Sequence, residues 1–111
     1  MLHVDDLLDL ILIQIAQLDG LSGRVFNVGG GPEVSASLLE MTQLCREFTG
    51  REIAIEADPK DRPADIPWYV TDNARITAAT GWKPIRGVPE IMQEICTWIS
   101  ENAEMLRPIL A

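Results

Sequence analysis

The sequence predicts an α/β fold built from short strands and about four helices. Apolar residues recur at helical spacing in several stretches, and short β-type runs bounded by glycine or proline stand between them. The predicted order is strand, helix, strand, helix, strand, loop, strand and two helices. Such an alternation indicates a parallel or mixed α/β arrangement. The strands are too few and too short to draw a closed sheet from them alone.

Length and composition indicate one soluble globular domain. The chain has 111 residues, of which 47% are hydrophobic and 23% charged, so it is too apolar to be intrinsically disordered. Its net charge of -8 opposes binding to nucleic acid or to an anionic membrane surface. The longest apolar-rich stretch, Leu7 to Leu18, contains polar residues and is too short to span a bilayer. The N-terminus is acidic where a signal peptide is basic, which favours a cytoplasmic protein.

The first predicted helix covers Leu7 to Leu18 and follows a short strand at Leu2 to Val4. Asp5 or Asp6 can cap it, because a carboxylate accepts hydrogen bonds from the free amides of the first turn. Apolar side chains lie on nearly all sides of this helix, which is typical of burial between two layers.

A strand, a glycine turn and a capped helix are predicted next. Arg24 to Val28 is a short β-type run, and the sequence Gly29-Gly30-Gly31-Pro32 forces the chain to turn. Ser37 and Glu40 have the spacing of a capping box. The helix behind that box ends before Gly50.

The second half of the chain alternates loops and short elements. Glu52 to Glu56 alternates polar and apolar residues, as a half-buried strand does. A charged, proline-rich loop then runs from Asp58 to Pro67. The remaining predicted features are a strand at Trp68 to Thr71, a helix capped by Asp72 over Ile76 to Ala79 and closed by Gly81, and a last helix opened by Pro89.

The triple glycine has two possible roles. Unobstructed amides between a strand and a helix can hold a phosphate group. The spacing here matches neither the G-x-G-x-x-G fingerprint nor a Walker loop, and Pro32 offers no amide hydrogen. A structural turn is therefore favoured over a backbone contact near a ligand, and both remain open.

The other reactive side chains have simple structural explanations. His3, the only histidine, has no partner at recognisable spacing, so packing or hydrogen bonding at a strand end is favoured over a general base. Asp5 and Asp6 favour a helix cap over a metal or acid-base site. Cys45 and Cys96 have no redox or metal spacing and are interpreted as small buried hydrophobes in a reducing cytosol. We therefore assign no catalytic, cofactor-binding or metal-binding residue.

The three tryptophans are judged in the same way. Trp98 lies on an apolar helix stripe and is predicted to be core. Trp82 is predicted to pack the turn after Gly81. Trp68 is a weaker candidate for lining a ligand cleft.

The proline-rich loop carries the candidate binding residues, Arg62 and Asp65. An arginine held between prolines is suited to a bidentate contact with a phosphate. Asp65 can accept hydrogen bonds from the hydroxyl groups of a sugar. A plain solvated loop with an internal salt bridge between the arginine and an aspartate is the alternative.

Five short segments occur in one order along nearly the whole chain. They are His3-Val4-Asp5-Asp6-Leu7, Phe26-Asn27-Val28-Gly29-Gly30-Gly31, Ser37-Leu38-Leu39-Glu40-Met41, Asp61-Arg62-Pro63-Ala64-Asp65 with Tyr69 and Asp72, and Gly81-Trp82-Lys83-Pro84. Together they resemble the C-terminal part of the extended short-chain dehydrogenase/reductase family, the NAD-dependent nucleotide-sugar epimerases and dehydratases. The sequence from Asp65 to Asn73 is most similar to that of CDP-sugar 2-epimerases of the paratose/tyvelose type.

The resemblance implies a place in a larger Rossmann-type fold. Residues 1–31 would be the end of the nucleotide-binding sheet region, with its last strand, and residues 32–111 the substrate-binding lobe. It further implies that Arg62 contacts the diphosphate of a nucleotide sugar and that Asp65 lies at the ribose end. Ala64 departs from the family, because many relatives have glycine there.

The family's cofactor and catalytic motifs do not occur in this sequence. There is no G-x-G-x-x-G, and the only tyrosine, Tyr69, is followed four residues later by Asn73 where the family's Tyr-x-x-x-Lys pair has lysine. The resemblance therefore implies a fragment that contributes the lobe for a nucleotide-diphosphate sugar and does not catalyse alone. NAD would be bound by the parent enzyme, with no cofactor held by this chain.

A second hypothesis comes from another class of protein. The chain could be a stand-alone interaction module without enzymatic activity. Its apolar helix at Leu7 to Leu18 would then need a cover, most simply a second copy of the chain. A homo-oligomer is accordingly expected.

Overall fold

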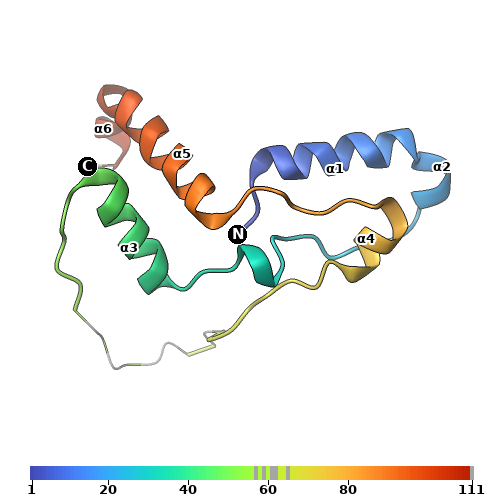
Figure 1. Cartoon of the computed structure of the whole chain (residues 1–111), viewed down its shortest axis with the longest axis horizontal. Helices are drawn as coiled ribbons and strands as arrows, with labels where there is room; N and C mark the ends of the chain where they lie inside the picture. The colour runs from blue at the N-terminus through green and yellow to red at the C-terminus, as the bar shows by residue number, and fades with distance from the viewer. Residues whose placement is uncertain (57, 59, 61–62, 65, 111) are drawn as a thin grey trace. The chain divides into compact units, whose positions relative to one another are not determined.

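The computed structural model describes residues 1–56, 58, 60, 63, 64 and 66–110, and every regular element in this part of the chain is helical. The elements are α1 (Val4–Ala16), α2 (Leu18–Leu21), the 3₁₀ helix η1 (Pro32–Val34), α3 (Leu38–Thr49), α4 (Ala74–Thr80), α5 (Val88–Glu101) and α6 (Ala103–Leu110) (Figure 1). They belong to two compact units. Unit 1 comprises Met1–Ser35 and Pro59–Gly87, and unit 2 comprises Ala36–Asp58 and Val88–Ala111.

The predicted α/β fold with short strands is therefore wrong. None of the four predicted strand segments forms a β-ladder among the described residues. A strand is stable only when its backbone amides and carbonyls pair with a neighbouring strand, and these segments have none in the described chain. Alternating side chains supply a local preference for extended backbone, but they cannot supply that neighbour.

Helix α1 is capped by a residue that the sequence did not suggest. The side chain of His3 accepts a hydrogen bond from the backbone amide of Asp5 over 3.1 Å between Nδ1 and N. The hydrogen-bonding role predicted for His3 is confirmed, although at a helix start. The predicted cap by Asp5 or Asp6 is wrong, because the carboxylate of Asp6 is bound elsewhere.

Unit 1 has a small core made of Leu10, Ile76 and Trp82. Trp82 is only 4% exposed, and its indole nitrogen donates to the carbonyl oxygen of Asp6 over 2.9 Å. The predicted packing of Trp82 after Gly81 is thus confirmed. Four partly buried residues surround this cluster, namely Leu2, Ile13, Phe26 and Val28.

Asp6 joins the start of α1 to the segment before α5. Its side chain is 1% exposed and accepts three hydrogen bonds: from Arg86 Nη1 at 2.7 Å, Arg86 N at 3.2 Å and Ile85 N at 3.3 Å. Burial alone would lower the pKa of Arg86. The hydrogen bond that Arg86 donates to Asp6 and the charges of Asp5, Asp6 and Asp9 outweigh burial and raise that pKa.

Helix α4 ends at Gly81 as predicted, but it begins at Ala74, earlier than the predicted start at Ile76, and Asn73 rather than Asp72 stands at its cap position. The Asp72 side chain accepts a hydrogen bond from the amide of Ala74 over 2.8 Å, and Gly81 closes the helix in the left-handed conformation at φ 75°. Asn73 occupies the cap position itself and uses its side chain differently. It accepts from the amide of Gly29 at 3.1 Å and donates to the carbonyl of Gly29 at 2.7 Å.

In the turn after residue 28, other parts of the chain approach the backbone so closely that only glycine fits. A Cβ added at Gly30 would collide with the Met1 carbonyl and would lie 2.8 Å from the Cβ of Val34. A Cβ at Gly29 would lie 2.8 Å from the Cβ of Thr71. The structural role of this turn is thus confirmed.

Replacing Gly30 with alanine should lower the free energy of unfolding by about 1–3 kcal/mol, because the added methyl group forces backbone apart. Urea denaturation followed by circular dichroism measures this loss. Gly20→Ala is the matched control, since a Cβ there meets no atom within 4 Å. Equal stability of the two variants would contradict the close approach at Gly30.

Unit 2 is built on α3 packed against α5. The capping box of Ser37 and Glu40 is present as predicted: Ser37 N donates to the Glu40 carboxylate at 2.7 Å, and Glu40 N donates to the Ser37 hydroxyl at 3.2 Å. Gly50 ends α3 in the left-handed conformation at φ 65°. The prediction that Trp98 is core is wrong, since this side chain is 52% exposed.

The capping box should make unit 2 sensitive to acid. Hydrogen bonds from the backbone and then the side chain of Ser37 hold the pKa of Glu40 below its ordinary value of 4.5. A lowered pKa contributes stability that is present above the ordinary value and lost as the pH falls through the folded value. We expect Glu40→Gln to lose less stability than the native chain between about pH 5 and pH 3. Urea denaturation at both pH values measures the difference, and identical losses would refute it.

Candidate functional site

The predicted binding residues Arg62 and Asp65 lie outside the described residues. Their assignment to a nucleotide-sugar diphosphate therefore stays a prediction. Between them, Ala64 has a positive φ of 64°, a conformation that glycine adopts at low cost and alanine does not.

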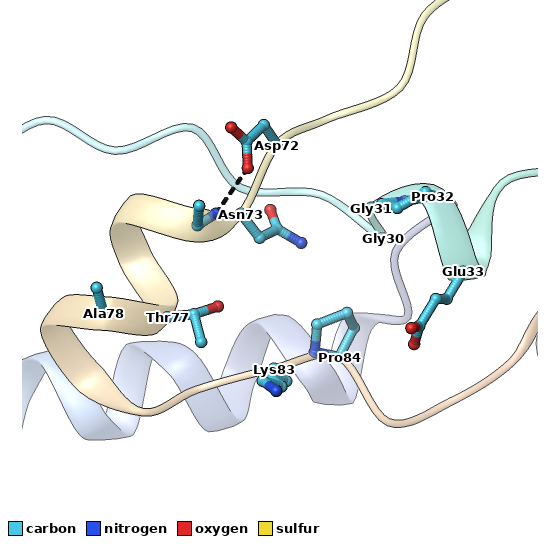
Figure 2. A pocket seen from close by; sticks show the side chains of 11 residues that line it. Gly30, Gly31, Pro32, Glu33, Asp72, Asn73, Thr77, Ala78, Lys83 and Pro84 are labelled. Carbon is cyan, nitrogen blue, oxygen red and sulfur yellow. Dashed lines mark hydrogen bonds between the residues drawn. The ribbon is translucent and has the colours of Figure 1, made fainter.

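Unit 1 contains a cavity of about 480 Å³ between the glycine turn and α4 (Figure 2). Cavities of this size fall within the range for small-molecule sites. Its wall comes from three parts of the unit: the glycine turn with η1, the first two turns of α4, and the segment after Gly81. The lining residues are Gly30, Gly31, Pro32, Glu33, Asp72, Asn73, Ala74, Thr77, Ala78, Lys83 and Pro84.

Two of the polar groups in this wall are already engaged by the protein. Asp72 holds the amide of Ala74, and the side chain of Asn73 is bound to both backbone groups of Gly29. In Figure 2 the Thr77 hydroxyl lies on the α4 side of the cavity, and Glu33 projects from η1. Lys83 completes the polar lining.

The charges of the wall limit what the cavity can bind. The wall includes one ammonium group, that of Lys83, and two carboxylates, those of Glu33 and Asp72, so it carries no excess positive charge for a phosphate. Among the described residues, no group of three or more His, Cys, Asp or Glu side chains could hold a metal ion.

Sequence reasoning found part of this wall and missed the rest. A backbone contact near a ligand is the less favoured of the two roles predicted for the glycine turn, and Gly30 and Gly31 line the cavity. Asn73 and Lys83 were not singled out. A signal for Asn73 exists in its place directly before α4, but its partner, Gly29, is 44 residues away.

The other sequence candidates are not brought to this cavity. The side chains of Trp68 and Tyr69 are exposed, and neither lines it. His3 and Asp5 belong to the start of α1.

Comparison with known proteins finds enzymes that act on nucleotide sugars. The chain is 29% identical to a CDP-paratose 2-epimerase from Salmonella typhi over 99 residues, which cover 89% of this chain and 29% of that enzyme. It is 27% identical to a UDP-glucose 4-epimerase from Erwinia amylovora over 93% of its length, and 27% identical to a dTDP-glucose 4,6-dehydratase from Streptomyces griseus over 98%. No family model and no solved structure matches the chain.

These matches confirm the resemblance to the extended short-chain dehydrogenase/reductase family of sugar epimerases and dehydratases. The chain spans about three-tenths of the length of the curated relatives it matches. No helix in the described part of the chain is both long and apolar enough to cross a membrane.

Proposed function

We propose that this chain forms the nucleotide-sugar binding part of an NAD-dependent epimerase or dehydratase. The observation that supports it is the similarity over about nine-tenths of the chain to enzymes named for CDP-, UDP- and dTDP-linked sugars. These substrates differ in base and in sugar, but all share a diphosphate. A mode of binding common to these enzymes would therefore involve the diphosphate.

Arg62 is the residue proposed to hold that diphosphate. Its guanidinium group stays charged at any physiological pH and can donate two parallel hydrogen bonds to phosphate oxygens. Asp65 is proposed to accept hydrogen bonds from the ribose hydroxyls. The oxidation and reduction of the sugar would use NAD and a Tyr-x-x-x-Lys pair. The 111 residues of this chain do not contain that pair.

The test is the affinity for a nucleoside diphosphate, measured by isothermal titration calorimetry with UDP and CDP. Arg62→Ala should weaken binding roughly 10- to 100-fold, the value of a charge-assisted contact. Arg51→Ala is the control with the same change of charge, and it should bind as the native chain does. Unchanged binding by Arg62→Ala would refute the assignment.

A second candidate function is self-association through α1. The helix buries Asp6 and Leu10 on one side. On the other side it exposes a row of apolar side chains, defined here as the α1 stripe: Val4, Leu8, Ile11 and Ile15. The spacing alternates between four and three residues, as in the seam of paired helices. Asp9 lies off the stripe and within 3.8 Å of Arg86, so two copies can meet without placing carboxylates opposite one another.

Sedimentation equilibrium tests the second candidate. The native chain should form a dimer whose fraction rises with concentration, and the double variant L8E/I15E should be a monomer. Leu39→Glu is the control, because Leu39 is also an exposed apolar residue but lies on α3. A native chain that stays monomeric at high concentration would refute self-association.

A further inference from the structure

Unit 2 brings the two cysteines of the chain to one helix interface. Cys45 lies on the inward side of α3, on the same face as the partly buried residues Met41 and Leu44. Cys96 lies on α5 four residues after the buried Met92. Since α3 packs against α5, the two thiols face the same contact. Both cysteines are free and half-buried.

Cys96 can also be reached from outside the interface. It lines a cavity of about 260 Å³ together with Phe48 of α3. The remaining wall is polar and belongs to α5: Gln93, Thr97, Ser100 and Glu101. Such a cavity admits a small polar oxidant to the sulfur atom of Cys96.

Burial and the neighbouring Cys45 both affect the pKa of Cys96. Burial raises the pKa of the Cys96 thiol, and the adjacent Cys45 thiol raises it further. Because the thiolate is the reactive form of cysteine, this raised pKa slows the reaction of Cys96 with an oxidant, so the reaction proceeds through the small deprotonated fraction.

We propose that peroxide converts Cys45 and Cys96 into a disulfide that fastens α3 to α5. One thiolate attacks hydrogen peroxide, so that an S–O bond forms, the O–O bond breaks and hydroxide leaves to become water. The second thiolate then attacks the resulting sulfenic sulfur, forming the S–S bond and releasing the oxygen as a second water. Two thiols are oxidised by two electrons and one peroxide is reduced.

This modification goes beyond the nucleotide-sugar function and acts on the stability of unit 2. Residues 45 and 96 are far apart in sequence, so the bond closes a long loop and restricts the unfolded chain more than the folded one. The oxidised unit should resist unfolding better than the reduced unit.

The test is oxidation of the full reduced chain at low concentration with hydrogen peroxide, followed by blocking with N-ethylmaleimide and intact-mass measurement. The expected product is a monomer lighter by two hydrogen atoms that takes up no maleimide. Trypsin without reductant should release the peptide of residues 25–46 joined to that of residues 87–111. The melting temperature should rise on oxidation and return on treatment with dithiothreitol.

Two comparisons make the outcome decisive. Cys45→Ser should show neither the linked peptides nor the rise in melting temperature. In the native chain dithiothreitol reverses the oxidation, so the effect on stability is also measured without any substitution that could impair folding. Oxidation in guanidinium chloride should give less of the linked product, because the helix interface is absent. Oxygen addition without linkage, a disulfide between two chains, or equal yield in denaturant would each overturn the proposal.

Discussion

Trp82→Ala should destabilise unit 1 by about 3–5 kcal/mol, the cost of removing a large aromatic side chain from a packed core. The indole is 4% exposed and contacts the cluster that contains Leu10 and Ile76, neither of which is more than 1% exposed. The variant also leaves the Asp6 carbonyl without the indole donor. Since a domain of this size has only about 5–15 kcal/mol of stability, this loss is a large part of the total and should shift the unfolding midpoint strongly.

The measurement is urea denaturation followed by circular dichroism. Trp68→Ala is the matched control, because Trp68 is 81% exposed. It should change the free energy of unfolding by no more than about 0.5 kcal/mol. Similar losses for the two tryptophan variants would show that Trp82 is not the centre of the core.

Asp6→Ala is the second substitution with a large expected effect, about 2–3 kcal/mol of stability. It removes the acceptor of three hydrogen bonds at once, two of them from the backbone amides of Ile85 and Arg86. Those amides would be left without this partner in a partly buried position. The segment that leads into α5 should then detach from α1.

Asp9→Ala is its control. Asp9 is also an α1 carboxylate near Arg86, but the distance from its Oδ2 to Arg86 Nη1 is 3.8 Å and its side chain is 54% exposed. Exposed pairs of this kind contribute between zero and about 1 kcal/mol. Hydrogen exchange of the Ile85 and Arg86 amides should rise in Asp6→Ala and stay low in Asp9→Ala. Equal exchange in both variants would contradict the role of Asp6.

The sequence predicted the helix boundaries best where short-range hydrogen bonds set them. Ser37 and Glu40 are three residues apart and form the expected box, and Gly81 ends α4 as expected. The prediction for the start of α1 was wrong, because His3 accepts the capping hydrogen bond that the sequence assigned to Asp5 or Asp6. Asp6 does not cap α1 because its carboxylate binds Arg86, which lies 80 residues away.

The candidate site was predictable only in part for the same reason. Gly30 and Gly31 carry a visible turn signal, whereas Lys83 has no local pattern that marks it as cavity lining. The strand predictions failed most widely. A period of two in residues 52–56 reports a preference for extended backbone, but a ladder also needs a second strand at hydrogen-bonding distance.

The sequence by itself determined the helices of α3 and α4, the stops at Gly50 and Gly81, the glycine turn and the similarity to nucleotide-sugar enzymes. Only the tertiary structure decided that Asp6 binds Arg86, that Trp82 fills the core of unit 1, and that Cys45 and Cys96 share one helix interface. A cap or a turn is closed by residues within a few positions of each other, so the interactions that stabilise it can be recognised in a short stretch of sequence. A contact across 80 residues depends on every segment that brings the two ends together.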